Sequence, residues 1–405
     1  MCSRSVSSPL LPSSRQVPWL LFIAIFSWLE VAGAAEPFDP RQPGPYPVGV
    51  TTMTLVDHSR VDPATQGPRT LLTEIWYPAT DETKDLPKNQ FSDFLLRGTN
   101  PALNLALQIG FKANVEELNK RFTNLAVRDA RVREGKFPLI LFSHGNGGIR
   151  QQSTFLCDYL ASHGYVVMSP DHTGNAAVTV VDGKLVTNKP ALRAASAEDR
   201  PKDLSFLIDC MTQMNKGSDS RFAGKVDLDR IGAAGHSFGG YTVGMVINAE
   251  PRIKAIVPLS PVFGKRENFT TPVLVILGTE DATIGVKGND NARAFFEESK
   301  GPHYLVEILD GGHFTFSDMF QIKPDFGDGI GKGKRITKPE EPIEYLGMKE
   351  SYEIINSYST AFFGKYVKGM TEYDRFLASN EFPQWIAYKA IAEPSPQTEA
   401  VGNGK

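Results

Sequence analysis

The 405-residue sequence predicts an α/β domain, in which a mostly parallel sheet carries helices on both faces. Two observations lead to this prediction. Several short apolar runs, such as residues 137–143, are continuous rather than alternating, which is typical of strands buried on both faces. Helix-compatible segments separate these runs, and that alternation requires crossover connections between parallel strands. No repeat of fixed period and no interdomain linker is visible, so we expect one domain over residues 35–405.

The first 34 residues are typical of a secretory signal peptide. Arg4 and Arg15 supply the positive charge, residues 17–29 form a short apolar run, and small residues follow up to Ala34 and Ala35. We expect cleavage after one of these two alanines and a secreted or periplasmic mature protein. An uncleaved anchor is the alternative, but the apolar run is short for a transmembrane helix, and no transmembrane segment is expected in the mature chain.

The first part of the domain alternates in the manner of two strands, residues 48–57 and 69–78, joined by a polar turn. Residues 80–136 have a different character. They are largely helix-compatible, with apolar residues such as Leu118, Phe122 and Leu125 at roughly helical spacing. We interpret them as a helical insertion.

From residue 137 strands and helices alternate regularly. Strands are expected at 137–143, 164–169, 230–235, 253–259, 273–277 and 304–309, and helices at 151–162, 197–214, 238–249, 292–298 and 351–366. Residues 318–346 form a second insertion, interpreted as a loop. Its run Gly327–Lys334 lacks the final glycine of phosphate-binding motifs and follows no strand, so we interpret it as a flexible loop.

Composition excludes several functions. With 43 basic and 46 acidic residues the net charge is −3, which gives no attraction for phosphate backbones, and we expect no nucleic-acid partner. Three cysteines are too few for a disulfide-dense scaffold or a cysteine-rich metal site. His172 follows Asp171, but no further ligand stands at metal-binding spacing. We therefore expect neither a metal nor a cofactor.

The strongest motif is Gly235-His236-Ser237-Phe238-Gly239-Gly240, which stands between a predicted strand and a predicted helix. In that context a GxSxG sequence predicts a nucleophile elbow, a turn so sharp that its flanking positions must lack side chains. The serine hydroxyl is then exposed at the tip, at the N-terminus of a helix that favours negative charge. Ser237 is the candidate nucleophile.

A serine nucleophile needs a base that is oriented by an acid, and on such a sheet the chain order is serine, acid, histidine. Asp281 follows the strand 273–277 at the carboxyl edge of the sheet, where open α/β sheets build their sites. Glu280 is the competing acid. His313 lies in a glycine-rich turn after the last parallel strand, and it is the histidine that follows the acid at this edge.

The same chemistry needs donors for a developing oxyanion. One candidate is the backbone N–H of Phe238, directly after the serine. The other is the backbone N–H of Asn146, in the run Ser143-His144-Gly145-Asn146-Gly147-Gly148 after the strand 137–143. The alternative is that this run is a plain glycine-rich turn.

At these residues the sequence resembles the α/β-hydrolase superfamily, and more narrowly the predicted dienelactone hydrolases and the plasma-type platelet-activating-factor acetylhydrolases. The resemblance rests on residues 142–148, 160–167, 231–243 and Arg200-Pro201-Lys202-Asp203. It implies an eight-stranded, mostly parallel sheet with ester hydrolysis at its carboxyl edge. It also implies that Cys157 and Cys210 lie on opposite faces of the sheet and form no disulfide.

Two departures from these relatives stand out. The plasma-type acetylhydrolases carry their acid just after the sixth strand, where this chain has Leu259-Ser260-Pro261-Val262-Phe263 and no carboxylate. The small dienelactone hydrolases use a cysteine nucleophile, where this chain has Ser237. We expect a secreted serine hydrolase that acts on a small-molecule, lipid or polymer ester. A serine amidase or peptidase, and a binding protein on an inactive hydrolase fold, are the alternatives.

Overall fold

The computed structural model describes residues 39–94, 112, 114–218, 220–263 and 269–391. The predicted signal peptide, residues 1–34, lies outside these residues, as does the stretch 95–111 of the predicted helical insertion. The described residues belong to one compact unit. No helix within the described ranges has the length and apolar character needed to span a membrane.

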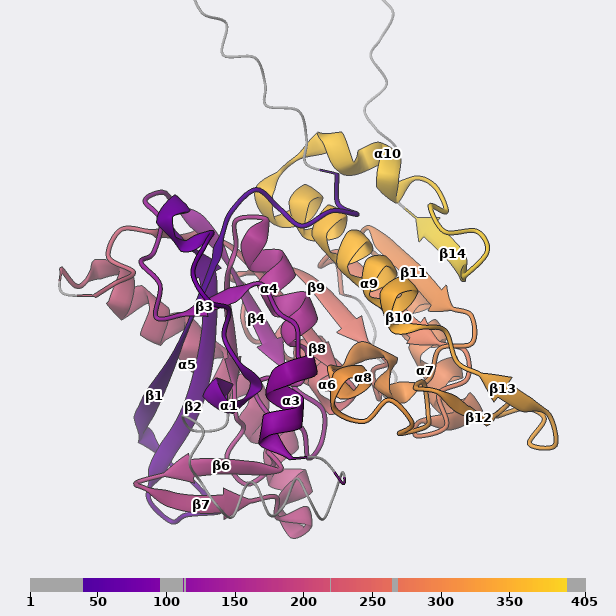
Figure 1. Ribbon diagram of the computed structural model, residues 1–405, viewed down its shortest axis with the longest axis horizontal. Helices are drawn as coiled ribbons and strands as arrows, with labels where there is room; N and C mark the ends of the chain where they lie inside the picture. The colour runs from indigo at the N-terminus through magenta and orange to yellow at the C-terminus, as the bar shows by residue number, and fades with distance from the viewer. Residues whose placement is uncertain (1–38, 95–111, 113, 219, 264–268, 392–405) are drawn as a thin grey trace, which may run out of the picture. The chain divides into compact units, whose positions relative to one another are not determined.

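A large sheet dominates the described part of the chain (Figure 1). Its strand order is β14-β11-β10-β9-β8-β4-β5-β2-β1-β3. The strands from β5 through β4, β8, β9 and β10 to β11 pair in parallel, whereas β1–β2, β2–β5 and β11–β14 pair antiparallel. The strands are β1 (Val48–Val61), β2 (Pro68–Pro78), β3 (Ala126–Arg128), β4 (Phe137–Ser143), β5 (Val166–Pro170), β8 (Val226–His236), β9 (Ile253–Leu259), β10 (Val273–Gly278), β11 (His303–Ile308) and β14 (Ile386–Ile391).

The expected count of eight strands is corrected to ten for the described residues. Each predicted strand corresponds to one of the eight between β1 and β11 in this order. The two additional strands lie at the edges: β3 pairs in parallel with β1, and β14 pairs antiparallel with β11. Both were missed because β3 has only three residues, and because β14 is exposed over much of its length and shows no apolar run.

Helices cover both faces of the sheet, and successive residues of each central strand point to opposite faces. On one face, Ile140 and Phe142 of β4 pack with α4 (Thr154–Ser162) and α9 (Met348–Phe363), which lie on the near side in Figure 1. On the other, Leu139 and Leu141 pack with α5 (Arg193–Lys216), α6 (Phe238–Val246) and α7 (Gly285–Glu298).

The two cysteines within the described residues follow this division. Cys157 of α4 is buried in the first core and Cys210 of α5 packs against the second, and both are free thiols. The sheet therefore separates them, as the resemblance implied.

The two insertions are irregular rather than uniformly helical or looped. The described part of 80–136 contains the short helices η1 (Asp81–Thr83), α1 (Phe91–Phe94) and α3 (Val115–Arg121), together with β3. Residues 318–346 contain α8 (Met319–Ile322) and a small hairpin of β12 (Lys332–Lys334) and β13 (Pro342–Glu344). The predicted loop Gly327–Lys334 is thus corrected at its end, where a strand forms because Lys332–Lys334 pair with β13.

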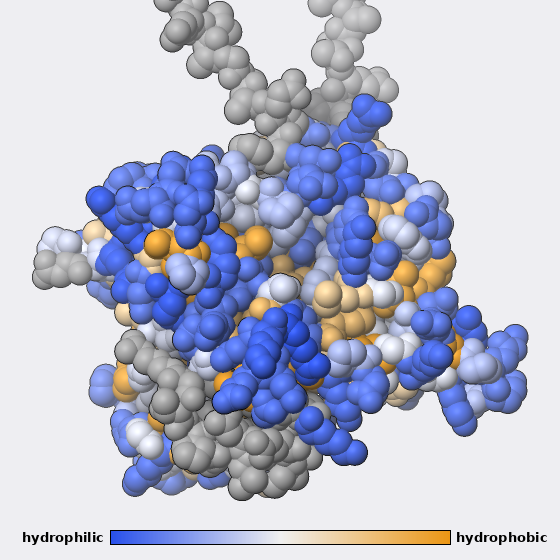
Figure 2. All heavy atoms as spheres, viewed as in Figure 1, coloured by the Kyte–Doolittle hydropathy of each residue, from blue (hydrophilic) through white to orange (hydrophobic). Residues whose placement is uncertain are grey.

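Short elements complete the described chain. They are the hairpin β6 (Val178–Val181) and β7 (Lys184–Thr187), the 3₁₀ turns η3 (Pro190–Leu192), η4 (His313–Phe316) and η6 (Thr371–Tyr373), the π-helical turn η5 (Gly364–Lys368) and α10 (Asp374–Leu377). Hydrophilic residues cover most of the face shown in Figure 2, with hydrophobic residues showing between them.

Candidate active site

Ser237 occupies the turn between β8 and α6 in a strained backbone conformation, with φ 56° and ψ −115°. Non-glycine residues enter this left-handed region rarely and at a cost of about 1–3 kcal/mol. The turn is tight because α6 packs against the end of β4. A Cβ atom at Gly239 would stand 1.8 Å from the carbonyl oxygen of Ser143, and one at Gly235 would stand 2.4 Å from the carbonyl oxygen of Gly239. Gly235 and Gly239 are therefore required at these positions, because a side chain at either one would collide with the backbone.

The structure brings the predicted acid and base together. Asp281, in the loop after β10, accepts a hydrogen bond from Nδ1 of His313 at 2.7 Å, and its carboxylate is fully buried. Its other oxygen accepts the backbone N–H of Ile284 at 2.9 Å. Because Nδ1 of His313 is held by the carboxylate, Nε2 is the ring nitrogen left for a second partner.

Glu280, the competing acid, lies elsewhere. Its two carboxylate oxygens accept hydrogen bonds from the Arg335 side chain and from the backbone N–H of Ile336, each at 2.8 Å. The two neighbouring carboxylates thus have separate sets of partners. Asp281 therefore faces His313 while Glu280 faces the 318–346 insertion.

Asp328 joins the acid loop to the histidine turn, a role that sequence analysis missed. Its Oδ1 accepts the backbone N–H groups of His313 at 3.0 Å and Ala282 at 2.8 Å, and its Oδ2 accepts the Thr283 hydroxyl at 2.7 Å. Asp328 lies in the glycine-rich run that was interpreted as a flexible loop. The run positions a carboxylate between the two loops, and a lone aspartate among glycines gives no periodic signal of such a role.

The two candidate oxyanion donors have unengaged backbone N–H groups. Phe238 is the first residue of α6, where the N–H has no intrahelical acceptor. No hydrogen bond from the Asn146 N–H to any described residue is found, while its side chain accepts one from Asn175 at 2.8 Å. The loop that carries Asn146 lies beside the nucleophile, since a Cβ at Gly145 would stand 3.5 Å from Cβ of Ser237.

A chain of side-chain hydrogen bonds connects this loop to the His313 turn. Gly145 N–H donates to Oε1 of Gln152 at 2.8 Å, and Nε2 of Gln152 donates to Nδ1 of His236 at 2.6 Å. Nε2 of His236 then donates to the carbonyl oxygen of His313 at 2.8 Å. Burial and the nearby His313 hold the pKa of His236 well below its usual value, so the ring is neutral with its proton on Nε2. His236, the residue before Ser237, thus connects the loop that carries Asn146 to the turn that carries His313.

Next to residues 144–148, here called the oxyanion loop, lies a second chain of hydrogen bonds, which is fully buried and includes Ser143. Nδ1 of His172 donates to Asp203 at 2.8 Å, and Nε2 of His172 accepts the Ser143 hydroxyl at 2.9 Å. Burial lowers the pKa of His172 to about 3, which keeps the ring neutral. Burial alone would raise the pKa of Asp203, but Arg69 and the hydrogen bond from His172 outweigh it and hold that pKa well below the usual value. All three side chains are inaccessible, which suits a structural role.

Arg200 adds a positive charge at this position. Its guanidinium donates to Ser143 Oγ and Asn175 Oδ1, each at 2.9 Å, and to the carbonyl oxygen of His144. It also lies 4.7 Å from the ring centroid of Phe238. Burial lowers the pKa of Arg200 to about 9, so it remains charged at neutral pH. Within the described residues it forms no ion pair with a carboxylate, and its charge therefore acts on the neighbouring turn.

Replacing Asp203 tests how strongly the free energy of unfolding depends on one carboxylate of this buried hydrogen-bond network. Asp203 pairs with Arg69 at 2.6 Å and Arg60 at 2.9 Å, so Asp203→Asn leaves the buried Arg69 guanidinium with Asp62 as its one remaining carboxylate partner among the described residues. We expect a loss of about 3–5 kcal/mol in the free energy of unfolding, measured in urea. Asp209→Asn is the control, because its pair with Arg252 is exposed and worth about 1 kcal/mol or less. Equal losses in the two variants would contradict the ranking.

Parts of the chain are similar to known ester hydrolases. Residues 133–321 match the family model described as PET hydrolase-like, and residues 35–198 match platelet-activating factor acetylhydrolase, isoform II. The chain is 25% identical to a platelet-activating factor acetylhydrolase from Bos taurus over 259 residues, 54% of each chain. It is 26% identical to lipase 1 from Moraxella sp. (strain TA144) over 227 residues, which cover 55% of this chain and 53% of the lipase. The chain thus spans about half the length of these curated relatives.

The solved structures include a ferulic acid esterase from Streptomyces cinnamoneus with a TM-score of 0.63 and 26% identity, over 80% of this chain and 91% of that one. Three observations support one fold: the order of strands in the sheet, the strand–turn–helix at Ser237, and the similarity to an acetylhydrolase, a lipase and an esterase. The protein has the α/β-hydrolase fold and is a member of the α/β-hydrolase superfamily.

Proposed function

We propose that this protein is a serine carboxylic-ester hydrolase in which Ser237, His313 and Asp281 form the catalytic triad. The observation that carries the proposal is the hydrogen bond between buried Asp281 and His313, formed at the sheet edge where the strained Ser237 turn also lies. A carboxylate that fixes one ring nitrogen of a histidine near a serine at such a strained turn is the arrangement that serine acyl transfer requires.

The reaction proceeds in two acyl-transfer steps. His313 accepts the proton of the Ser237 hydroxyl as the oxygen attacks the ester carbonyl, and Asp281 stabilises the imidazolium that forms. His313 then gives the proton to the departing alcohol, which leaves an acyl group on Ser237. Water, deprotonated by His313, attacks this acyl-enzyme, and collapse of the second tetrahedral intermediate returns the proton to Ser237 and releases the acid.

Charge on the tetrahedral oxygen is stabilised by the backbone N–H groups of Phe238 and Asn146. Both lack other acceptors within the described residues, so neither must break a protein hydrogen bond to receive the oxyanion. Removing one such donor typically costs about 100- to 1000-fold in rate. The buried charge of Arg200, stacked on the Phe238 ring, favours negative charge at the same turn.

For the substrate we propose a small, lipid or polyester-type carboxylic ester. Ser237, Asp281 and His313 all fall within residues 133–321, the segment that matches the PET hydrolase-like family model, whereas the match to the acetylhydrolase family model ends at residue 198. The acid after β10 rather than β9 also departs from the plasma-type acetylhydrolase pattern. These two points favour a cutinase-like polyester or simple ester over an acetylated phospholipid.

A series of p-nitrophenyl esters from acetate to palmitate, with and without a serine-directed phosphonate, tests the proposal. We expect turnover that the phosphonate abolishes and that Ser237→Ala lowers by at least about 10⁴-fold, because the nucleophile is removed. The melting temperature of the variant should stay within a few degrees of the wild type or rise slightly, because the substitution removes a hydroxyl and no packing contact. If the phosphonate labels the protein but no ester is hydrolysed, amides become the expected substrates. If the phosphonate does not label the protein, an inactive binding protein is favoured.

A paired comparison tests the acid. Asp281→Asn removes the carboxylate that orients His313, and we expect kcat to fall by at least about 10³-fold. Glu280→Gln breaks only the contact with Arg335 and should lower kcat by less than about tenfold. Both kcat values are measured on the best ester of the series. A larger loss in Glu280→Gln than in Asp281→Asn would show that the acid is assigned wrongly.

We also propose that residues 1–34 are a cleaved signal peptide and that the enzyme acts outside the cytoplasm, in the periplasm or the medium. The support is the sequence pattern alone: two arginines, an apolar run and small residues at Ala34 and Ala35. N-terminal sequencing of protein from the exported fraction should begin at Ala35 or Glu36. Recovery of the full chain, starting at Met1, from the membrane fraction would show an uncleaved anchor instead.

A further inference from the structure

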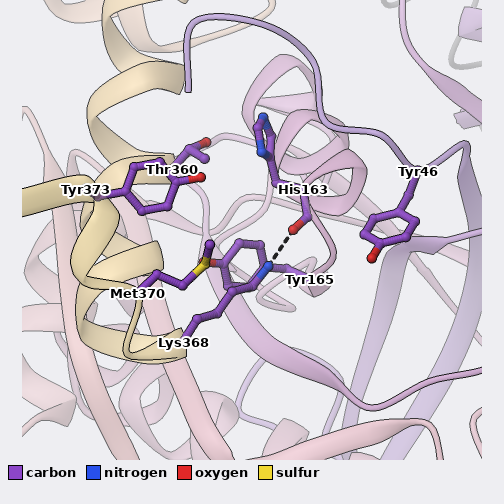
Figure 3. A pocket seen from close by; sticks show the side chains of 7 residues that line it. All are labelled: Tyr46, His163, Tyr165, Thr360, Lys368, Met370 and Tyr373. Atoms are coloured by element: carbon purple, nitrogen blue, oxygen red, sulfur yellow. Dashed lines mark hydrogen bonds between the residues drawn. The ribbon is translucent and has the colours of Figure 1, made fainter. Parts of the chain in front are cut away.

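A cavity of about 70 Å³ lies outside the candidate active site, and Figure 3 shows the side chains that line it. Tyr165 and His163, which line it, precede β5, so the cavity is at the edge where the parallel strands begin. Ser237, Asp281 and His313 follow the carboxyl ends of their strands at the opposite edge. The lining residues are Tyr46, His163, Tyr165, Thr360, Lys368, Met370 and Tyr373.

Lys368 brings a cation to this cavity. It ends the π-helical turn η5, and its ammonium donates to the carbonyl oxygen of His163 (Figure 3). The ammonium also lies 4.1 Å from the ring centroid of Tyr165. No carboxylate in the described parts of the chain forms an ion pair with it. A buried ammonium without a counter-ion is costly, and the protein must either neutralise it or supply an anion.

Two hydroxyl groups in the cavity wall have no hydrogen-bond partner among the described residues. They belong to Tyr165 and Thr360, whose side chains are each only 1% exposed. Buried hydroxyls are almost always paired in native proteins, so an orphan pair facing one cavity needs an explanation. Both are O–H donors that can point at an acceptor held between them.

We propose that this cavity binds a small monovalent anion, a halide or a carboxylate of the size of formate, held by the Lys368 ammonium and the hydroxyls of Tyr165 and Thr360. The cavity exceeds the roughly 10–15 Å³ that one water molecule needs but is far too small for a lipid headgroup. The site is separate from ester hydrolysis.

The charged groups around Lys368 agree with an anionic ligand. Burial, together with the charge of Arg230 in β8, lowers the pKa of Lys368 to about 7. Burial also lowers the pKa of His163 to about 4 and raises those of Tyr165 and Tyr373, to about 12 in the second case, so these three groups are neutral near pH 7. The nearby carboxylates act on other groups: Asp39 is paired with Arg41, and Asp374 with Lys365.

The sign of the pH dependence follows. The anion binds the protonated ammonium, so binding strengthens as the pH falls through 7 and weakens as it rises above. By linkage, the bound anion raises the pKa of Lys368. A ligand that bound equally to the neutral amine would show no such dependence.

The experiment measures the melting temperature of the full chain while bromide or formate replaces gluconate at constant ionic strength. At pH 6 we expect a saturable rise on the order of 2 °C for the wild type, and a smaller rise at pH 8.5. Lys368→Met should abolish the rise, whereas Lys300→Met, which removes an exposed lysine outside the cavity, should keep it. A rise that is equal in all three proteins is a general salt effect and overturns the proposal.

A second pair of variants keeps the test decisive if Lys368→Met fails to fold. Thr360→Val removes one proposed donor, and Ser359→Ala removes the neighbouring hydroxyl of α9, which is also buried and unpartnered but does not line the cavity. We expect Thr360→Val to lower the anion affinity by about tenfold and Ser359→Ala to leave it unchanged. Equal affinities in the two variants, or anomalous scattering from bromide-soaked crystals that places no bromide in the cavity, would overturn the site.

Discussion

The contact between Gly239 and the carbonyl oxygen of Ser143 is the constraint on which the candidate site depends. It allows α6 to begin directly against the end of β4, and a single methyl group at Gly239 would collide with that carbonyl at 1.8 Å. The close approach has two consequences. The chain between β8 and α6 must turn so sharply that Ser237 takes a left-handed conformation, and the loop after β4 comes to lie beside the serine. The proposed nucleophile and the proposed oxyanion donors are therefore positioned by the same packing contact.

The rest of the site is built outward from this contact by side chains that link neighbouring loops. His236 reaches the His313 turn, Gln152 joins His236 to the oxyanion loop, and Asp328 joins His313 to the loop of Asp281. In the chain through Gln152 and His236, each side chain accepts a hydrogen bond with one atom and donates one with another, so the orientation of each is fixed. Because loops held in this way cannot move independently, a geometry required for acyl transfer can persist without a ligand, which is the preorganisation on which electrostatic catalysis depends.

Sequence patterns predicted those features that have a local cause. Alternation at residues 48–57 and 69–78 and apolar runs further along the chain predicted the eight inner strands, and the steric demand of a sharp turn predicted Ser237 and its glycines. The order of elements along the chain gave Asp281 and His313, which the structure brings within 2.7 Å. The links between loops could not be predicted. Asp328 stands in a run that resembles a mobile loop, and Gln152 acts across 84 residues of sequence on His236. Such contacts are set by tertiary packing and leave no periodic or compositional trace.

Arg200 and Lys368, two cations with no carboxylate partner among the described residues, show how the choice of side chain determines what a charge can do. Arg200 remains charged at neutral pH, so the protein surrounds it with neutral acceptors and the face of Phe238, and its field at the elbow is permanent. Lys368 has a pKa of about 7 because burial disfavours its ammonium form, so its charge depends on its surroundings. A permanent charge suits a site that must stabilise an oxyanion in every turnover. A titratable amine beside unpartnered hydroxyls suits a site that is charged when an anion is present and neutral when it is not.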